Sequence, residues 1–189
     1  MEYSYKFRIY PNAEQRALIQ KTFGCSRFVY NHFLAQRISE YKATGKAPTR
    51  FQQDKMLTAL KREILWLKEV DSIPLQAELQ NLDSAYQGFF RRVKKGEKPG
   101  FPRFKSKRDR RKSYKTKQHI TNGKPTIYVD DKHIRLPKLG LVKCRISKEV
   151  KGRILSATVS QNPSGKYFVA LCCTDVEIAP LPSTVVFIE

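Results

Sequence analysis

The residues best suited to chemistry in this chain are cations that surround aromatic rings between residues 91 and 117. This stretch holds 14 lysines and arginines against two acids, so 27 of the 189 residues carry +12 of the formal charge of +20. Phe101, Phe104 and Tyr114 are interleaved with the cations. Cations neutralise phosphates and release counterions, and aromatic rings stack on bases. The pattern favours a nucleic acid as partner over a solvated charged segment, which would lack the aromatics. The sequence also favours a nucleic acid over a membrane as partner, because no apolar stretch approaches the roughly 20 residues of a membrane span.

Two parts of this basic region offer different contacts to a nucleic acid. In "GFPRFK", residues 100–105, the two phenylalanines either stack on bases or fill the core where helices meet strands, and the sequence favours neither. Residues 113–123 supply hydroxyl and amide groups, which bond to base edges as well as to phosphates. The candidates for such sequence-reading contacts are Ser113, Tyr114, Thr116, Gln118, Thr121 and Asn122.

The sequence contains no constellation of catalytic or metal-binding residues. Hydrolysis of a phosphodiester usually needs two or more carboxylates around metal ions, and the adjacent Asp130 and Asp131 are explained by a hairpin turn. The four cysteines form no C-x-x-C pair and the three histidines are scattered, so zinc spacing is absent. Cys25 is expected to be a small core residue. We therefore expect no metal, no cofactor and no catalytic residue, and reduced thiols in a cytoplasm.

Helical periodicity and cap signals predict four helices between residues 11 and 96. Residues 12–15 and 49–52 each fit a capping box, in which two side chains satisfy the free amides of a helix start. Gly24 is expected to end the first helix and separate it from the second. Asp71 precedes the fourth helix, whose apolar stripe is the most regular. Four helices with short connections are typical of a small bundle.

Alternating apolar and polar residues predict strands at the start of the chain and beyond residue 113. Residues 3–9 alternate strictly, with Lys6 and Arg8 on the solvent face. Residues 126–136 and 153–173 each predict a hairpin. The first strand has no neighbour in sequence, so its partners must come from the later strands. We therefore expect an α+β fold, an antiparallel β-barrel of the oligonucleotide-binding type with the helical bundle inserted after its first strand.

Several blocks of this sequence together resemble a known family. "YKFRIYPNAEQ", "RFVYNHFL", "WLKEVDSIPLQ", "NLDSAYQGFFR", "KPGFPRFKSK" and "GRILSATVSQNPSGKYFVAL" resemble, in order and spacing, the N-terminal half of the TnpB proteins of insertion sequences. The match covers residues 3–182. TnpB proteins are RNA-guided DNA endonucleases related to type V CRISPR effectors. The resemblance implies a wedge β-barrel and an inserted recognition bundle, which hold a guide RNA from the element's end and read a short motif beside a double-stranded DNA target.

The resemblance also implies a division of the chain and a set of contact residues. The expected parts are a first wedge strand, the recognition bundle, a basic linker, the rest of the barrel and the stub of a RuvC-like strand, at residues 1–10, 11–96, 97–112, 113–182 and 183–189. The residues expected to bind the target motif are Arg50, Phe51, Gln52, Asp54, Ser72, Ile73, Gln76, Thr121 and Asn122. Gln76 is the first choice, because an amide can pair bidentately with adenine; the alternative is an ordinary exposed helix glutamine. The residues expected to bind RNA or phosphate are Lys6, Arg8, Arg103, Lys105, Lys107, Arg110, Arg111, Lys112, Tyr114, Lys115 and Lys117.

The end of the sequence, "VVFIE", resembles the start of the RuvC-like nuclease domain of full-length relatives. Phe187 and Glu189 stand where the family has a glycine and a metal-binding aspartate. We therefore expect a chain that does not cut DNA alone, in a prokaryotic cytoplasm near the nucleoid. It would bind guide RNA and occupy targets as a regulator, supply the recognition half of a split nuclease, or be an inert remnant. The expected protein partner is a RuvC-like nuclease subunit in trans or a second copy of itself. We expect no membrane among its partners.

A different class of protein also remains open, a protein-only regulator with a helix-turn-helix. Its second helix, residues 25–41, offers Arg27, Asn31, Gln36 and Arg37 to read bases, together with much aromatic bulk. Such a composition suits a bundle core better than a helix in the major groove.

Overall fold

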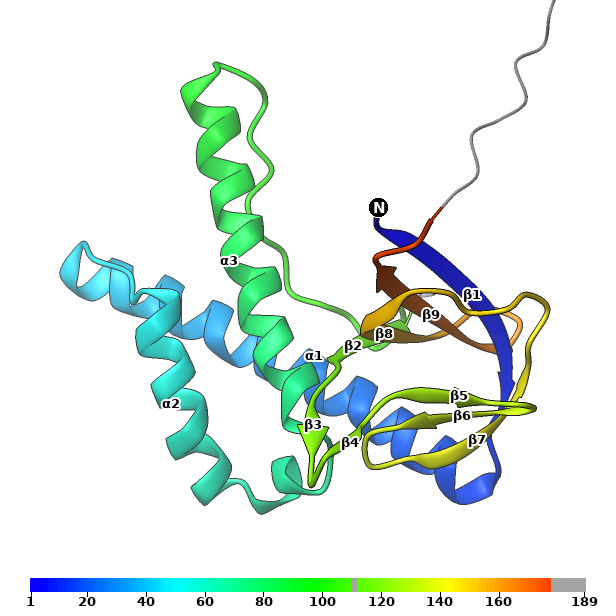
Figure 1. Ribbon diagram of the computed structural model, residues 1–189. Coiled ribbons are helices and arrows are strands. Elements are labelled where there is room, and N and C mark those ends of the chain that lie inside the picture. The colour runs from blue at the N-terminus through cyan, green and yellow to red at the C-terminus, as the bar shows by residue number, and fades with distance from the viewer. Residues whose placement is uncertain (110–111, 178–189) are drawn as a thin grey trace, which may run out of the picture.

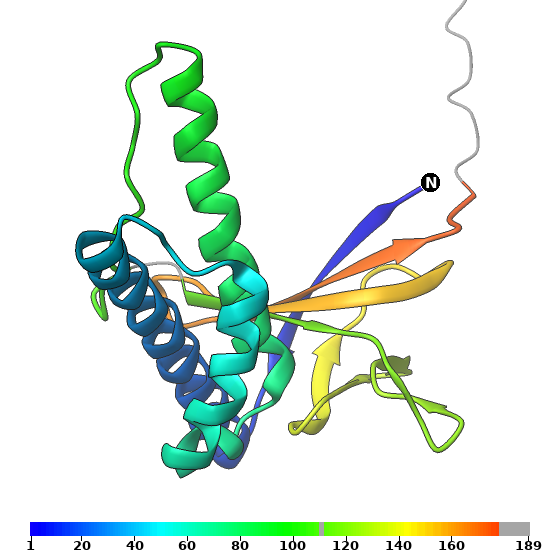
Figure 2. The same ribbon diagram turned by 90° about the vertical axis from the view of Figure 1, so that its left-hand side faces the viewer.

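The computed structural model describes residues 1–109 and 112–177 as helices on one side and a curled antiparallel sheet on the other (Figures 1 and 2). The helical part consists of α1 (Ala13–Thr44), α2 (Arg50–Glu63), the 3-10 helix η1 (Leu65–Lys68) and α3 (Ser72–Lys94). The strands are β1 (Tyr3–Tyr10), β2 (Lys112–Lys117), β3 (Ile120–Thr121), β4 (Lys124–Pro125), β5 (Tyr128–Asp130), β6 (His133–Leu136), β7 (Gly140–Arg145), β8 (Arg153–Gln161) and β9 (Tyr167–Thr174). The predicted α+β class is confirmed, and all helices lie between the first and second strands.

The first strand pairs with the later β region, as its isolation in the sequence predicted. The seven-stranded sheet has the order β2-β8-β9-β1-β7-β6-β5, and β1 is antiparallel to both neighbours. The two predicted hairpins are present as β5–β6 and β8–β9. In β1 the odd-numbered residues Tyr5, Phe7 and Ile9 are buried, so the period of two correctly predicted which face meets the core.

The expected closed barrel is not formed, because β2 and β5 are the two edges of the sheet and no backbone ladder between described residues joins them. A side chain spans this gap instead. The Gln118 amide donates from Nε2 to the Ile127 carbonyl and accepts at Oε1 from the Ile127 N–H, both at 2.7 Å. The backbone N–H of Gln118 donates to Leu155 on β8 at 2.9 Å. Together with the bond from the Thr126 N–H to the His119 carbonyl at 2.9 Å, Gln118 links the two sheet edges without a strand pair.

Replacing Gln118 with alanine should destabilise the fold by about 2 kcal/mol, because it leaves a buried N–H and carbonyl of Ile127 without partners. Urea unfolding measures this loss, and hydrogen exchange at the Ile127 amide should speed up in the same variant. The exposed Gln80 on α3 gives a matched control, since Gln80→Ala removes the same side chain from a solvent face. Equal stability of the two variants would contradict a closing role for Gln118.

The helices differ from the predicted four-helix bundle, because α1 is one unbroken helix of 32 residues that runs through Gly24. Glycine in a helix costs about 1 kcal/mol relative to alanine, which packing easily outweighs. Ile19 and Phe23, before Gly24, pack into the core of the sheet, whereas Cys25 and Val29, after it, pack into the core of the helices. A continuous α1 therefore joins the two cores. The capping boxes predicted for α1 and α2 are both confirmed.

Polar contacts fix the helices to the sheet at both ends of the junction. Gln15 on α1 donates to the carbonyls of Leu139 and Leu141, at 3.1 and 2.8 Å. The Asp71 carboxylate caps α3 at the Ile73 N–H and also accepts from the Thr116 hydroxyl of β2 at 2.6 Å. Within the described residues, none of the helices has the length and apolarity needed to cross a membrane.

Candidate nucleic-acid interface

The solvent face of the sheet carries cations on both sides of a strip of small side chains. The register places Lys6 of β1 beside Ala170 of β9, Ala170 beside Thr158 of β8, and Thr158 beside Lys115 of β2. Both lysines are exposed. Neighbouring strands lie about 4.8 Å apart, so the two lysines flank a strip roughly 14 Å wide. Small residues between rows of cations leave room for a phosphate backbone to approach the sheet.

The two adjacent rows carry cations on one side only. Arg8 lies between Arg145 of β7 and Phe168 of β9, and the Lys6 ammonium is 5.0 Å from the centre of the Phe168 ring. Lys117 lies beside Ser156, which lies beside Cys172. The structure therefore brings together Lys6, Arg8, Lys115 and Lys117 of the expected phosphate-binding set. It adds Arg145, whose alternation with Val142 and Cys144 on β7 was the sequence signal for an outward side chain.

The basic loop before β2 is attached to the helices rather than free. Asn31 on α1 accepts from the Lys105 N–H at 2.8 Å and donates to its carbonyl at 2.9 Å. The Lys105 ammonium pairs with Glu78 of α3 and lies 4.4 Å from the centre of the Tyr30 ring. Lys105 therefore has a structural role, while Arg103 and Lys107 are exposed. The predicted contacts of Arg110 and Arg111 lie outside the described residues, as does the predicted strand at 183–189.

Tyr114, which was expected to bind RNA, lies in the core of the structure. Its ring is buried and packs edge-on against Phe23 of α1, with ring centres 5.8 Å apart. Burial, and secondarily the charge of Asp71, raises the pKa of its phenol far above the ordinary value. In β2, Tyr114 and Thr116 alternate with exposed residues, so the strand period already placed Tyr114 on the core face.

The structure also bears on the two roles that the sequence left open for Phe101 and Phe104. Neither belongs to a core, so they do not fill the junction of helices and strands. Phe101 packs edge-on against Phe89 and Tyr86 of α3, at 5.4 and 5.6 Å between ring centres. Phe104 remains more than half exposed.

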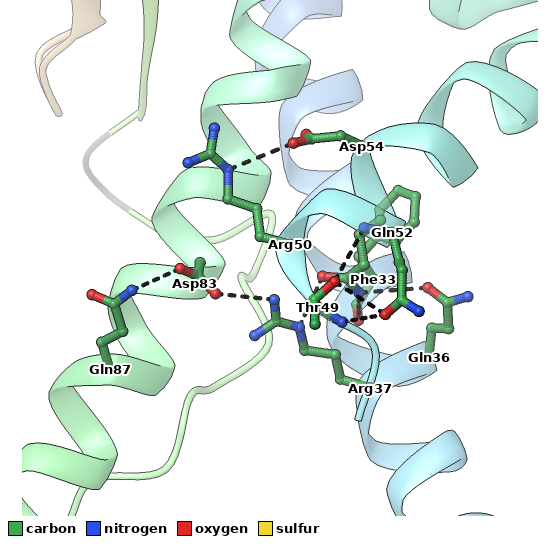
Figure 3. A network of polar contacts seen from close by, with 10 residues as sticks. Phe33, Gln36, Arg37, Thr49, Arg50, Gln52, Asp54, Asp83 and Gln87 are labelled. Carbon is green, nitrogen blue, oxygen red and sulfur yellow. Dashed lines mark hydrogen bonds and ion pairs between the residues drawn. The ribbon is translucent and has the colours of Figure 1, made fainter. Parts of the chain in front are cut away.

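The start of α2 carries four of the residues expected to read DNA, and three of them, Arg50, Gln52 and Asp54, make contacts within the helix and its cap (Figure 3). Gln52 is the capping-box residue, whose Oε1 accepts from the Thr49 N–H at 2.8 Å. Arg50 and Asp54 pair one turn apart at 3.6 Å, and both reach solvent. Phe51 is 70% exposed, with the Lys55 ammonium 5.0 Å from its ring centre. Phe51, Arg50 and Asp54 are therefore accessible to a partner, and Gln52 is occupied by its helix.

The remaining expected readers lie at two other places. Ser72 and Ile73 are half-buried in the first turn of α3, and Gln76 is exposed one turn later. Thr121 and Asn122 are exposed at the β3–β4 hairpin, where Asn122 has φ 51° and Gly123 φ 72°. Asparagine followed by glycine suits this turn by backbone conformation alone.

The two helix starts are separated along α3. Arg37 of α1 bonds to both Gln53 of α2 and Asp83 of α3, so the first turn of α2 lies level with Asp83. Ser72 comes 11 residues earlier, which at about 1.5 Å per residue corresponds to roughly 16 Å. The expected readers are therefore distributed along the bundle rather than clustered.

Arg37 connects the three helices of the bundle, whereas the sequence suggested it only as a residue that reads bases. It is buried, donates from Nε to Gln53 Oε1 at 2.8 Å and from Nη2 to Asp83 at 3.2 Å, and lies 5.0 Å from the centre of the Tyr86 ring (Figure 3). Gln53 also donates to the Phe33 carbonyl at 3.1 Å. These bonds hold the start of α2 against α1 and α3.

Nothing in the described part of the chain groups three or more histidine, cysteine or acidic side chains as a metal site would. Cys25 is buried as predicted, and burial is the main cause of its raised thiol pKa.

Comparison with known proteins identifies relatives over all of these elements. A model described as a helix-turn-helix domain, HTH_OrfB_IS605, matches residues 1–46. A protein of Streptomyces pristinaespiralis, named as a candidate RNA-guided DNA endonuclease, is 32% identical over 188 residues, which cover 96% of this chain and 43% of that protein. The virulence protein VsdF of Salmonella dublin is 35% identical over 111 residues, covering 54% of this chain and 91% of VsdF. The chain belongs to the TnpB family.

A further TnpB relative agrees with this assignment. InsQ of Escherichia coli K12, also named as a candidate RNA-guided DNA endonuclease, is 32% identical over 170 residues, which cover 89% of this chain and 39% of InsQ. The chain thus spans about two-fifths of the length of the two relatives named as endonucleases. In this TnpB-family chain the residues matched by the helix-turn-helix model form β1 and the unbroken α1.

Proposed function

We propose that this chain is a nucleic-acid-binding module of a TnpB-type, RNA-guided DNA-targeting protein. The sheet holds a guide RNA by its phosphates, and the helical bundle, with the β3–β4 hairpin, reads a short motif in duplex DNA. The division into wedge and recognition parts at residues 1–10, 11–96, 97–112 and 113–182 belongs to this proposal. Cleavage of the target falls to a RuvC-like nuclease, outside the binding surfaces described above.

The observation that carries the proposal is the pattern across the sheet. Lys6, Arg8, Lys115 and Lys117 project from its solvent face around Ala170 and other small residues. Lysine and arginine at this spacing neutralise successive phosphates, and each neutralised phosphate adds the free energy of counterion release. Base reading would come from exposed side chains of the bundle, with Gln76, Arg50 and Phe51 as first candidates.

The helix-turn-helix regulator is disfavoured by the shape of α1. Its two helices would be residues 13–23 and 25–41, but α1 passes through Gly24 without a turn. A recognition helix must project into the major groove at an angle to its neighbour. The second half of α1 also buries Val29, Phe33 and Leu34 in the bundle core, which removes that face from contact with DNA.

Expression of the chain with its native locus, followed by purification in moderate salt and sequencing of the bound RNA, tests the proposal. We expect one dominant transcript from beside the gene that ends in a variable segment. We expect no sequence preference on duplex DNA without that RNA. A mixture of abundant RNAs that is lost at higher salt would contradict guide binding. Sequence-specific binding to duplex DNA by the RNA-free protein would instead support the regulator.

A further inference from the structure

A pocket of about 160 Å³, lined mainly by charged residues and serines, lies where α1, α3, the basic loop and β2 meet. Helix α1 contributes Ser26 and Arg27, and β2 contributes Lys112 and Ser113. The remaining lining residues are Phe23, Glu78, Lys105, Ser106 and Asp109. The pocket is thus built by three segments that are far apart in the sequence: α1, α3, and the basic loop with the start of β2.

Ser26 lines this pocket, and its hydroxyl has no hydrogen-bond partner among the described residues. It is 2% exposed, and among the described residues its Oγ is the single buried side-chain oxygen or nitrogen without a hydrogen bond. A buried hydroxyl without a partner has lost its hydration with no hydrogen bond to compensate for it. Thr22, one turn earlier, donates its hydroxyl to the Leu18 carbonyl at 2.8 Å, whereas Ser26 makes no such bond to its own helix. An unpaired hydroxyl in a polar pocket indicates a ligand that accepts a hydrogen bond.

The charges of the pocket identify an anion as that ligand. The lining holds three cations against two carboxylates: Glu78 pairs with Lys105, and Asp109 keeps its charge while it accepts from the Ser106 N–H at 3.0 Å. Arg27 and Lys112 form no ion pair with any described residue. The groups left over are two cations and the hydroxyls of Ser26 and Ser113. A phosphate group, with its several acceptor oxygens and negative charge, matches this set of donors.

The surroundings indicate that the phosphate belongs to a nucleic-acid strand. A second, more open cleft of about 420 Å³ adjoins the pocket and shares Asp109 and Lys112 with it. It is lined by Lys107 and Arg108 on one side and by the β8–β9 turn on the other. Lys112 opens β2 on the side of Tyr114 and Thr116, whereas Ser113 shares the solvent face with Lys115 and Lys117. A strand whose backbone lies on the sheet can therefore pass Ser113 at the sheet edge and continue into the open cleft.

We propose that Ser26, Arg27, Lys112 and Ser113 bind one backbone phosphate of the guide RNA at the junction of the helices and the sheet. This inference rests on the proposed function, because the strand is the one that the sheet holds. The bound phosphate bridges α1 and β2, so RNA binding stabilises the arrangement of the bundle on the sheet.

Two substitutions with a charge-matched control test the pocket. Ser26→Ala and Lys112→Gln should each weaken binding of the copurifying RNA about tenfold, since hydrogen bonds to charged groups are worth more than neutral ones. Lys112→Gln should also lower the slope of log K against log salt by about 0.7. Lys148→Gln removes one exposed charge from the loop that precedes β8, at the opposite end of that strand from Gln161. Its affinity should stay within about twofold of the wild type.

Thermal melting separates a ligand role of Ser26 from a structural one. Ser26→Ala removes an unpaired buried hydroxyl, so the RNA-free variant should melt at or above the wild-type temperature. Inorganic phosphate provides a second probe: it should raise the melting temperature of the wild type and of Lys148→Gln more than that of Ser26→Ala. If Ser26→Ala proves unstable, Lys112→Gln in both assays still decides the proposal.

The outcomes of these experiments test the phosphate pocket and the proposed function separately. RNA binding that neither variant changes would overturn the pocket and leave the function in place. Binding of inorganic phosphate that depends on Ser26, without binding of a defined RNA, would support a site for a free phosphate group and overturn the guide-RNA function. Failure to bind either ligand would overturn both.

Discussion

Replacing Lys6, Arg8, Lys115 and Lys117 together with glutamine should weaken RNA binding about two-hundredfold at 0.15 M salt. Each phosphate contact on a single strand contributes about 0.7 to the slope of log K against log salt, or about fourfold at this concentration relative to 1 M. Losing four contacts should therefore lower the slope by about 3. All four side chains are exposed, so the stability of the protein should change little. Fluorescence anisotropy with the copurifying RNA across a salt series measures both quantities.

A second fourfold variant controls for net charge. Lys61, Lys68, Lys148 and Lys151 lie on α2, η1 and the loop before β8, away from the small-residue strip. Their replacement by glutamine removes the same four charges but should affect affinity by less than about tenfold, through the general field alone. If both variants lose affinity equally, the sheet face is not the binding surface and the charge of +20 acts without a defined site.

Replacing Arg37 with methionine should destabilise the protein by about 3 kcal/mol, the largest loss that we expect from a single substitution. The change leaves Gln53 and Asp83 without their buried donor, and breaking one side of a buried ion pair typically costs 3–5 kcal/mol. The lower end applies because the Asp83 side chain is 27% exposed. In a chain of this length the melting temperature should fall by about 9 °C. Calorimetry or circular dichroism measures the shift.

An exposed arginine on the neighbouring helix gives the matched control. Arg50→Met removes an ion pair whose partners are both partly in water, so it should cost less than about 0.5 kcal/mol. The double variant Arg37→Met, Asp83→Leu should be more stable than Arg37→Met alone, because no charge is then left unpaired. A melting temperature for Arg37→Met within 2 °C of that of Arg50→Met would show that the network does not support the bundle.

The sequence by itself determined the local structure, because local structure depends on neighbours in the chain. The period of two placed Tyr5, Phe7 and Ile9 on the buried face of β1. Turn formers located the β8–β9 hairpin, and the capping boxes located the starts of α1 and α2. The isolation of the first strand also predicted its pairing with later strands. The blocks that resemble the TnpB family are likewise recognised from the order of residues alone.

Tertiary structure decided the features that depend on distant residues. Glycine at position 24 costs helix stability, but packing of the two halves of α1 into two cores outweighs this cost. A side chain such as Gln118 is polar in any sequence, and only the edges of the folded sheet turn it into a link between strands. Arg37 and Ser26 look like surface residues by type, and their burial follows from packing against α2, α3 and β2. Propensity and periodicity depend on residues that are close in the sequence. The burial and pairing of a polar group depend on residues that the fold brings near it from elsewhere in the chain.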